Sequence, residues 1–286
     1  MRLSNSAIKL NNRALKPFLF GDITIKLLLR SLIIIPLLVY VGSWAYAYFF
    51  FNRIAFQPPS PSYQDTGAII KLVSNRERIS AIYLKNPNSR YTILYSHGNA
   101  EDIGLLLPIF ERLQEMGFSI FAFDYRGYGT SSGQPSEEGT YRDIDAAYEY
   151  LTLHVKVPAD QIIALGRSLG GAVAIDLAKR KPLAGLVIES SFVSAFRVVT
   201  SIPLFPWDRF RSISKIKDVH CPVLVIHGTN DTVIPFWHGE RLFQQANDPK
   251  LSYWVKHAGH NDLFEVAGSG YAQALKSFTA KINNNI

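Results

Sequence analysis

Cysteine is nearly absent from this sequence of 286 residues, which contains only Cys221. A single cysteine cannot form an intramolecular disulfide, so cysteine usage does not indicate a redox compartment. Because Cys221 precedes a proline and a strand-like apolar run, we interpret it as a small core residue and not as a nucleophile. The sequence also has no low-complexity segment and no repeat of fixed period, which argues against a disordered or solenoid protein.

The net charge of +7 is unevenly distributed along the chain. Seven basic residues and one acidic residue lie up to Phe56, whereas the rest of the sequence has 23 basic and 22 acidic residues. A basic arm beside an apolar run is typical of a membrane protein, and the body that follows is nearly neutral. We therefore expect a membrane, and not nucleic acid, as the partner of the arm.

One apolar run is long enough to cross a bilayer. Residues 31–52 read SLIIIPLLVYVGSWAYAYFFFN, with no charge between Arg30 and Arg53. About 20 helical residues span the hydrocarbon core, and aromatic side chains such as those near the far end of this run favour the headgroup layer. The sequence predicts a basic cytoplasmic arm at 1–30, a transmembrane anchor at 31–52 and a proline-rich linker at 53–64.

Two alternatives to an anchor remain open. Residues 45–47 have the small-x-small form of a signal-peptide cleavage site, although the apolar run is long for a signal peptide. A buried core helix is the second, although core helices of this length usually show a polar stripe.

Six basic residues precede the run and only Arg53 closely follows it, so the N-terminus is predicted to be cytoplasmic. The catalytic body is then expected on the periplasmic, lumenal or extracellular side.

Apolar strands alternate with helices in the body, residues 65–286. The predicted strands are 68–73, 79–84, 91–96, 118–123, 162–165, 184–189, 222–227 and 251–255, and the predicted helices are 103–116, 136–153, 170–179, 236–246 and 271–282. This pattern is typical of an α/β fold, with a mostly parallel central sheet and helices on both faces. Residues 190–219 interrupt the alternation. We interpret them as a small apolar lid, and an ordinary crossover helix with irregular ends is the alternative.

A candidate nucleophile follows the strand at 162–165. Gly166-Arg167-Ser168-Leu169-Gly170 matches G-x-S-x-G and leads into a helical run. A serine hydroxyl is a weak nucleophile that must be exposed on a sharp strand-to-helix turn, where glycines relieve crowding. The spacing does not match a phosphate-binding loop. We therefore predict Ser168 to be catalytic.

The base and the acid are expected after later strands. His260 follows the strand at 251–255 and is preceded by a glycine, whereas its rival His257 sits closer to the strand end and is expected to be structural. Asp231 follows the strand at 222–227, and Glu189 is the weaker alternative. The order Ser168, Asp231, His260 is typical of α/β-hydrolases, in which the acid orients the imidazole.

Two backbone N–H groups are needed to stabilise the oxyanion of a tetrahedral intermediate. We expect one from Leu169, directly after the nucleophile, and one from Asn99, in the loop after the strand at 91–96. His97, in the same loop, is interpreted as structural. No acidic or cysteine residue accompanies His257 and His260 at metal-ligand spacing, so neither a metal nor a cofactor is expected.

Five motifs together resemble the α/β-hydrolase-domain-containing serine hydrolases, in particular their membrane-anchored, depalmitoylase-like and serine-aminopeptidase-like branch. The motifs are SHGNAEDIG, FDYRGYGTSSGQPSEEGTYRD, GRSLGGAVA, PVLVIHGTNDTVIP and HAGHND, and the similarity runs from about residue 68 to residue 278. The resemblance implies the α/β-hydrolase fold, with Ser168, Asp231 and His260 at the triad positions of the family.

The predicted function is hydrolysis of an acyl ester or thioester, from a small-molecule or lipid-linked substrate, by a membrane-anchored serine hydrolase. The apolar lid and the anchor favour an acyl chain, but one triad serves many substrates. A serine aminopeptidase and a non-catalytic, membrane-tethered binding protein are the alternatives. The sequence indicates neither the natural substrate nor an oligomeric state.

Overall fold

The structure, a computed structural model, describes residues 16–200 and 202–284. Half of the expected basic arm, residues 1–15, therefore lies outside the described residues. The chain divides into two compact units, residues 1–51 and residues 52–286. We refer to the second as the C-terminal unit.

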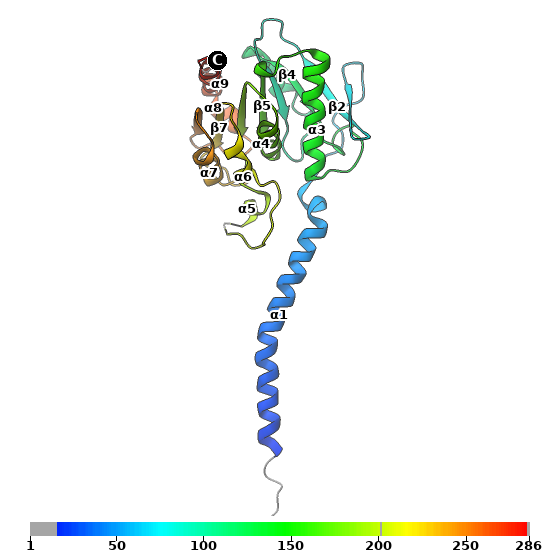
Figure 1. Cartoon of the computed structure of the whole chain (residues 1–286), viewed down its shortest axis with the longest axis vertical. Coiled ribbons are helices and arrows are strands. Elements are labelled where there is room, and N and C mark those ends of the chain that lie inside the picture. Colours follow the sequence, from blue (N-terminus) through cyan, green and yellow to red (C-terminus); the bar gives the residue numbers. More distant parts are fainter. Residues whose placement is uncertain (1–15, 201, 285–286) are drawn as a thin grey trace, which may run out of the picture. The chain divides into compact units, whose positions relative to one another are not determined.

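A single helix, α1 (Lys16–Ala55), contains the apolar run (Figure 1). Its segment Leu27–Ala55 has a mean hydropathy of 1.9 and is long enough to cross a membrane. The hydroxyls of Ser31 and Ser43 donate to carbonyls of the same helix, Leu27 O at 2.6 Å and Val39 O at 2.8 Å. These bonds leave an apolar surface on which few polar groups need an external partner.

The C-terminal unit contains the alternating elements that the sequence predicts. Its strands are β1 (Ile70–Ser74), β2 (Glu77–Leu84), β3 (Thr92–Ser96), β4 (Ser119–Phe123), β5 (Ile162–Arg167), β6 (Gly185–Glu189), β7 (Val223–Gly228) and β8 (Lys250–Val255). Its α-helices are α2 (Leu107–Glu115), α3 (Glu137–Glu149), α4 (Leu169–Arg180), α5 (Ala195–Val199), α6 (Ser212–Lys215), α7 (Trp237–Gln245), α8 (Leu263–Ala267) and α9 (Ser269–Asn283). A π-helical turn (Tyr150–Val155) continues α3, and short 3₁₀ turns lie at Ala159–Gln161 and Ile216–Asp218.

The strands form one sheet in the order β1-β2-β4-β3-β5-β6-β7-β8. The pairs β1–β2 and β2–β4 are antiparallel, and every pair from β4 to β8 is parallel. Parallel neighbours need a crossover that packs on a sheet face, which explains why a helix or the 190–219 segment follows each strand from β3 to β7. The predicted mostly parallel α/β fold is confirmed.

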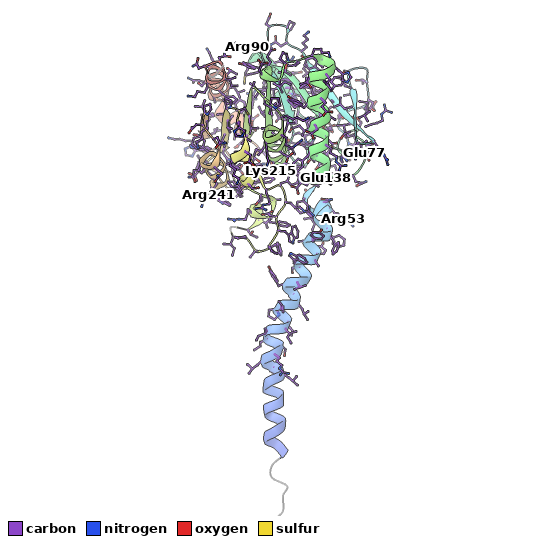
Figure 2. The ribbon with its side chains drawn as sticks, in the orientation of Figure 1. Arg53, Glu77, Arg90, Glu138, Lys215 and Arg241 are labelled. Atoms are coloured by element: carbon purple, nitrogen blue, oxygen red, sulfur yellow. The ribbon has the colours of Figure 1, made fainter. Side chains whose placement is uncertain are left out.

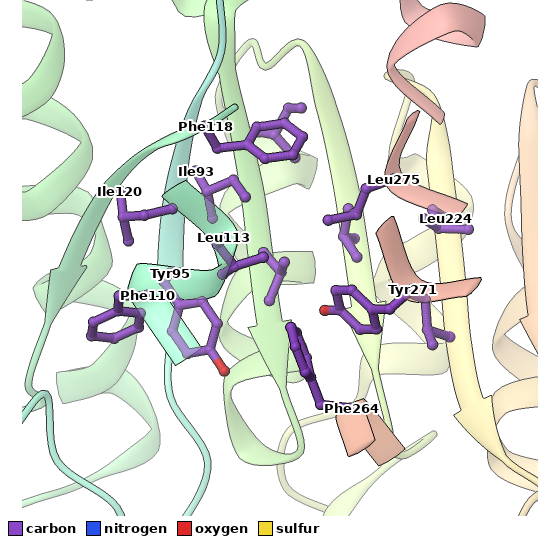
Figure 3. Close-up of a cluster of buried hydrophobic side chains, with 14 of the residues drawn as sticks. Ile93, Tyr95, Phe110, Leu113, Phe118, Ile120, Leu224, Phe264, Tyr271 and Leu275 are labelled. Carbon is purple, nitrogen blue, oxygen red and sulfur yellow. The ribbon is translucent and has the colours of Figure 1, made fainter. Parts of the chain in front are cut away.

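Alternation along the strands divides the core into two layers. Ile93 and Tyr95 of β3 belong to a cluster with Phe110 and Leu113 of α2 and with Tyr271, Leu275 and Phe278 of α9 (Figure 3). Successive strand side chains point to opposite faces, so buried residues between them, such as Leu94, line the other face. The helices α3, α4, α6 and α7 contact one another in series on that face.

Charged side chains lie on the outside of the C-terminal unit, as Figure 2 shows for Arg90, Glu138 and Arg241. Among the described helices, α3 has a side-chain cap at its start. The hydroxyl of Ser136 accepts the N–H of Gly139 at 3.1 Å, which caps the start of α3. Such caps satisfy backbone donors that have no partner within the helix.

The segment between β6 and β7 is largely irregular, with α5 and α6 as its only α-helical turns among the residues described there. Three rings, Phe196, Phe205 and Trp207, pack together with centroid separations of 4.8–6.0 Å. Beyond them, Val199 and Ile202 are 85% and 62% exposed. The segment therefore combines an aromatic cluster with an exposed apolar surface.

Candidate active site

The carboxyl ends of the parallel strands bring distant parts of the sequence to one edge of the sheet. Ser96 pairs with Gly166, Arg167 pairs with Glu189, and Gly228 pairs with Val255. The loops that follow these residues therefore begin side by side. This edge is where α/β sheets position their functional groups.

Ser168 occupies a tight turn between β5 and α4. Its backbone has φ 53° and ψ −115°, a conformation that costs energy for a residue with a side chain. A Cβ on Gly166 would lie 2.1 Å from Gly170 O, and a Cβ on Gly170 would lie 2.0 Å from Ser96 O. Only glycine fits at these two positions, so the pentapeptide is built to hold the serine outward from the sheet.

Three side chains from three loops form a hydrogen-bonded series at this edge. The hydroxyl of Ser168 lies 3.1 Å from His260 Nε2, and His260 Nδ1 lies 2.7 Å from an Asp231 carboxylate oxygen. If Nδ1 carries the proton and donates to Asp231, Nε2 is left to accept the hydroxyl proton of Ser168. The structure thus places together the three residues that the sequence predicts as nucleophile, base and acid.

The Asp231 carboxylate is fixed by its own loop. Its second oxygen accepts the N–H groups of Val233 at 2.9 Å and Ile234 at 2.7 Å. Burial acts to raise the pKa of Asp231, but the hydrogen bond and charge of His260 and the Ile234 N–H together lower it below its usual value. The carboxyl therefore stays ionised at neutral pH and orients the imidazole ring.

The rival residues lie elsewhere. His257, which was expected to be structural, has an exposed side chain. Its backbone has φ 64°, and its N–H donates to Thr229 Oγ1 at 2.9 Å. Glu189 is buried, but its carboxylate accepts the hydroxyl of Tyr271 at 2.6 Å and faces Arg167. Neither side chain hydrogen-bonds to Ser168 or His260, although the backbone carbonyl of Glu189 accepts the N–H of Ser168 at 2.8 Å.

The two expected oxyanion donors belong to the turn that carries Ser168 and to a loop that packs against it. Leu169 begins α4 directly after the serine, where helix N–H groups have no partner inside the helix. A Cβ on Gly98 would lie 3.5 Å from Ser168 Cβ, so the loop that carries Asn99 packs against the nucleophile. The geometry is consistent with an oxyanion site between Asn99 and Leu169.

The Asn99 side chain joins this loop to the start of the C-terminal unit. Its amide nitrogen donates to Ala55 O at 2.8 Å, and its oxygen accepts from Gln57 N at 3.0 Å and Tyr128 Oη at 2.6 Å. Phe56, between them, is only 4% exposed and lies against Phe210 with ring centroids 6.0 Å apart. Residues 55–57 are therefore bound to the loop after β3 that carries Asn99, which we call the oxyanion loop for the donor that the sequence predicts there.

His97 and Cys221 are two further residues that the sequence indicates are not catalytic. His97 is buried, its Nδ1 lies 2.7 Å from Gly98 O, and burial lowers its pKa to about 4, so it is neutral and supports the turn. Cys221, which was expected in the core, is only half-buried, but desolvation still raises the pKa of its thiol to about 12. A thiol with so high a pKa carries almost no thiolate at neutral pH and is a poor nucleophile.

Arg167 and Glu101 are residues whose place the sequence did not reveal. They form an ion pair, with side chains 14% and 19% exposed, beside a cavity of about 300 Å³ that His260 also lines. A signal was present, because Arg167 is a charged residue at the end of an otherwise apolar strand. Its partner could not be read from the sequence, since 66 residues separate the two.

Comparison with known proteins identifies the family. The chain is 37% identical over 259 residues to the alpha/beta hydrolase domain-containing protein aho-3 of Caenorhabditis elegans, covering 79% of this chain and 76% of that protein. It is 35% identical over 262 residues to the human alpha/beta hydrolase domain-containing protein 17B, covering 80% and 90%. The chain belongs to the alpha/beta hydrolase domain-containing family. Residues 87–207 of the chain match the family described as serine aminopeptidase, S33.

Solved α/β-hydrolase structures share the fold. An esterase of Pyrococcus furiosus superposes with a TM-score of 0.65 at 19% identity, covering 78% of this chain and 99% of that one. A monoacylglycerol lipase of Paleococcus ferrophilus superposes with a TM-score of 0.58 at 21% identity, covering 71% and 99%. The resemblance stated from the motifs is therefore confirmed at the level of family and fold, and the protein is a serine hydrolase.

Proposed function

We propose that the protein is a membrane-anchored hydrolase of acyl esters or thioesters with Ser168, His260 and Asp231 as its catalytic triad. The observation that carries the proposal is the unbroken series of contacts from Ser168 Oγ to His260 (3.1 Å) and from His260 to Asp231 (2.7 Å), on a strained turn. The esterase and lipase named among the structural neighbours support an acyl substrate.

The chemistry follows from the geometry. Ser168 Oγ attacks the acyl carbonyl while His260 Nε2 takes the hydroxyl proton, and Asp231 stabilises the imidazolium. The N–H groups of Asn99 and Leu169 bind the oxyanion. When the tetrahedral intermediate collapses, His260 returns the proton to the departing alcohol or thiol and an acyl-enzyme forms. Water, deprotonated by His260, then releases the acid and restores Ser168.

A peptidase acting at a free N-terminus is the second candidate, because the matched family is described as serine aminopeptidase. Such an enzyme needs unpaired negative charge for the substrate ammonium. The cavity beside His260 contains Glu101, Glu189 and Glu265, but Arg167 pairs with the first two and Arg112 lies 3.6 Å from the third. These ion pairs favour the acyl hydrolase.

An acyl-binding role for the 190–219 lid gives a chain-length prediction. We expect kcat/KM on p-nitrophenyl esters to rise from acetyl to at least octanoyl, with thioesters accepted, since each buried methylene is worth about 0.8 kcal/mol, or at most about fourfold. Phe205→Ala and Trp207→Ala should flatten this rise more than they lower acetyl-ester turnover, because the two rings stack 6.0 Å apart over a cavity of about 250 Å³.

Tyr83→Ala is the control for the lid variants, since this aromatic residue lies on β2, toward the opposite edge of the sheet, and packs against Phe121. It should leave the shape of the chain-length profile unchanged. Equal turnover at every chain length, or a clear preference for aminoacyl-peptide substrates, would remove the acyl proposal and favour the aminopeptidase.

The anchor proposal rests on α1. Its apolar side chains are exposed, with Leu32 at 71%, Ile33 at 72% and Phe49 at 77%, which is unlike a buried core helix. The flanking charges favour a cytoplasmic N-terminus, with the catalytic domain 65–286 across the membrane. We expect the full chain to stay with membranes through washes in high salt and alkali and to be released by detergent. Release by salt alone would indicate a peripheral basic arm.

Two truncations test where the anchor ends and the catalytic unit begins. A chain starting at Asn52 should be soluble and active, because it keeps Phe56 and the Asn99 contacts. A chain starting at Pro58 lacks them, and we expect its kcat to fall by about tenfold or more as the oxyanion loop loosens. Equal kcat for both chains would show that residues 55–57 are only a spacer.

A further inference from the structure

Arg167 lies immediately before Ser168, and its guanidinium group contacts three other segments of the chain. It pairs with Glu101, in the loop after β3, and its Nε lies 3.4 Å from Glu189 Oε1 at the end of β6. Its Nη2 donates to His260 O at 3.0 Å and to Asn261 Oδ1 at 3.1 Å, in the loop after β8. One side chain thus meets the loops that carry the oxyanion donor and the base.

Glu101 transmits this contact to the oxyanion loop. While one carboxylate oxygen pairs with Arg167, the other accepts the N–H of Gly98 at 2.8 Å. Gly98 directly precedes Asn99, and a Cβ on Gly98 would lie 2.8 Å from Glu101 and 3.5 Å from Ser168. The Glu101 carboxylate therefore holds the peptide group that carries the Gly98 N–H. The next peptide group carries the Asn99 N–H, which we assign to the oxyanion site.

The base is held from two sides. Asp231 fixes the ring of His260, whereas Arg167 fixes its backbone carbonyl. The rest of the loop is closed on itself, because Gly259 N donates to Asp262 Oδ1 at 2.6 Å. Without Arg167, the His260 ring would still be held by Asp231. The His260 carbonyl, however, would lose the N–H donor that Arg167 supplies from the turn beside Ser168.

We infer that Arg167 and Glu101 are a positioning pair that holds the oxyanion loop and the His260 loop in register with Ser168. The inference rests on the proposed triad. Arginine suits this role because its planar group presents five N–H donors in fixed directions, and a lysine ammonium cannot reach a carboxylate and a carbonyl on different loops with the same geometry. The pair contacts loop groups and not the reacting atoms, so its effect is on geometry.

The test compares Arg167→Met, Arg167→Lys and Glu101→Gln in the full-length protein in detergent, with active sites counted by a fluorophosphonate probe. Displacing reacting groups by about 1 Å costs on the order of a hundredfold. We expect kcat per labelled site to fall by about that factor in Arg167→Met, and by about tenfold in the other two, with KM within about twofold. The double variant Arg167→Met/Glu101→Gln should be no worse than Arg167→Met, because both changes break one unit.

A transition-state mimic separates positioning from general stability. The Ki of an alkyl trifluoromethyl ketone, which forms the oxyanion on Ser168, should rise in proportion to the loss in kcat, while KM for the ester does not. Arg180→Met is the matched control, since Arg180 also bridges two carboxylates, Asp145 and Asp176, but at the far end of α4. It should leave kcat and Ki unchanged.

Two results would overturn the inference. Normal kcat per labelled site in Arg167→Met, with or without a lower melting temperature, would make the pair a structural ion pair only. If Arg167→Met does not fold, normal kcat and Ki in both Arg167→Lys and Glu101→Gln would do the same. Failure of the triad itself is distinguishable, because Ser168→Ala would then retain turnover whatever the Arg167 variants do.

Discussion

Ser168→Ala is expected to lower kcat on acyl esters by at least about a thousandfold and to abolish covalent labelling by a fluorophosphonate. The hydroxyl is the atom that His260 Nε2 faces at 3.1 Å, and alanine leaves no nucleophile on the turn. The residual rate should come from the oxyanion donors and substrate binding alone. The measurement is steady-state turnover of the purified full-length protein, with labelling read on a gel.

The contacts of Ser168 indicate that its hydroxyl can be removed without disturbing the fold. Among the described residues, its hydroxyl bonds only His260, while its backbone N–H donates to Glu189 O and its carbonyl accepts from Ser191 Oγ. Loss of the hydroxyl should therefore leave the fold intact. Ser277→Ala, an exposed serine on α9, is the matched control and should keep both turnover and labelling. Near-normal hydrolysis by Ser168→Ala would show that another group is the nucleophile.

Periodicity and spacing predicted the fold well because its central strands, β3 to β7, are mostly apolar runs buried on both faces. Each predicted strand overlaps an observed one, and β7 and β8 end within a residue of the prediction. Shorter elements were missed for a physical reason. The helix α8 has five residues, α6 has four, and neither presents enough turns for a hydrophobic period to appear.

Candidate site residues were predicted where local sequence decides their position. The glycines around Ser168 predict a tight turn. Asp231 and His260 follow strands whose carboxyl ends lie at the same edge of the sheet. The exposure of His257 was not predicted, because it depends on a left-handed backbone at φ 64°. Contacts of Arg167 with Glu101 and of Asn99 with Gln57 were also missed, since they join residues 66 and 42 positions apart.

The second large effect is expected at the base. His260→Ala should lower kcat by about a thousandfold or more, because no other group in the described site is placed to take the proton of Ser168. Nearby His227 does not replace it. That ring is buried, burial lowers its pKa, and its Nε2 lies 2.8 Å from Ile234 O. Turnover per folded molecule and the rate of fluorophosphonate labelling are the measurements.

His257→Ala is the sharpest control for the base, because it removes the same side chain three residues earlier in the same loop. Its ring is exposed, and the contact that fixes the residue is its backbone N–H to Thr229 Oγ1, which alanine keeps. We therefore expect kcat and the labelling rate to stay within about threefold, because a surface change of this kind alters the free energy of unfolding by under about 0.5 kcal/mol and leaves His260 in place. Inactive His257→Ala beside active His260→Ala would exchange the two roles. Activity in both would mean that the proton of Ser168 is taken by a group outside this loop.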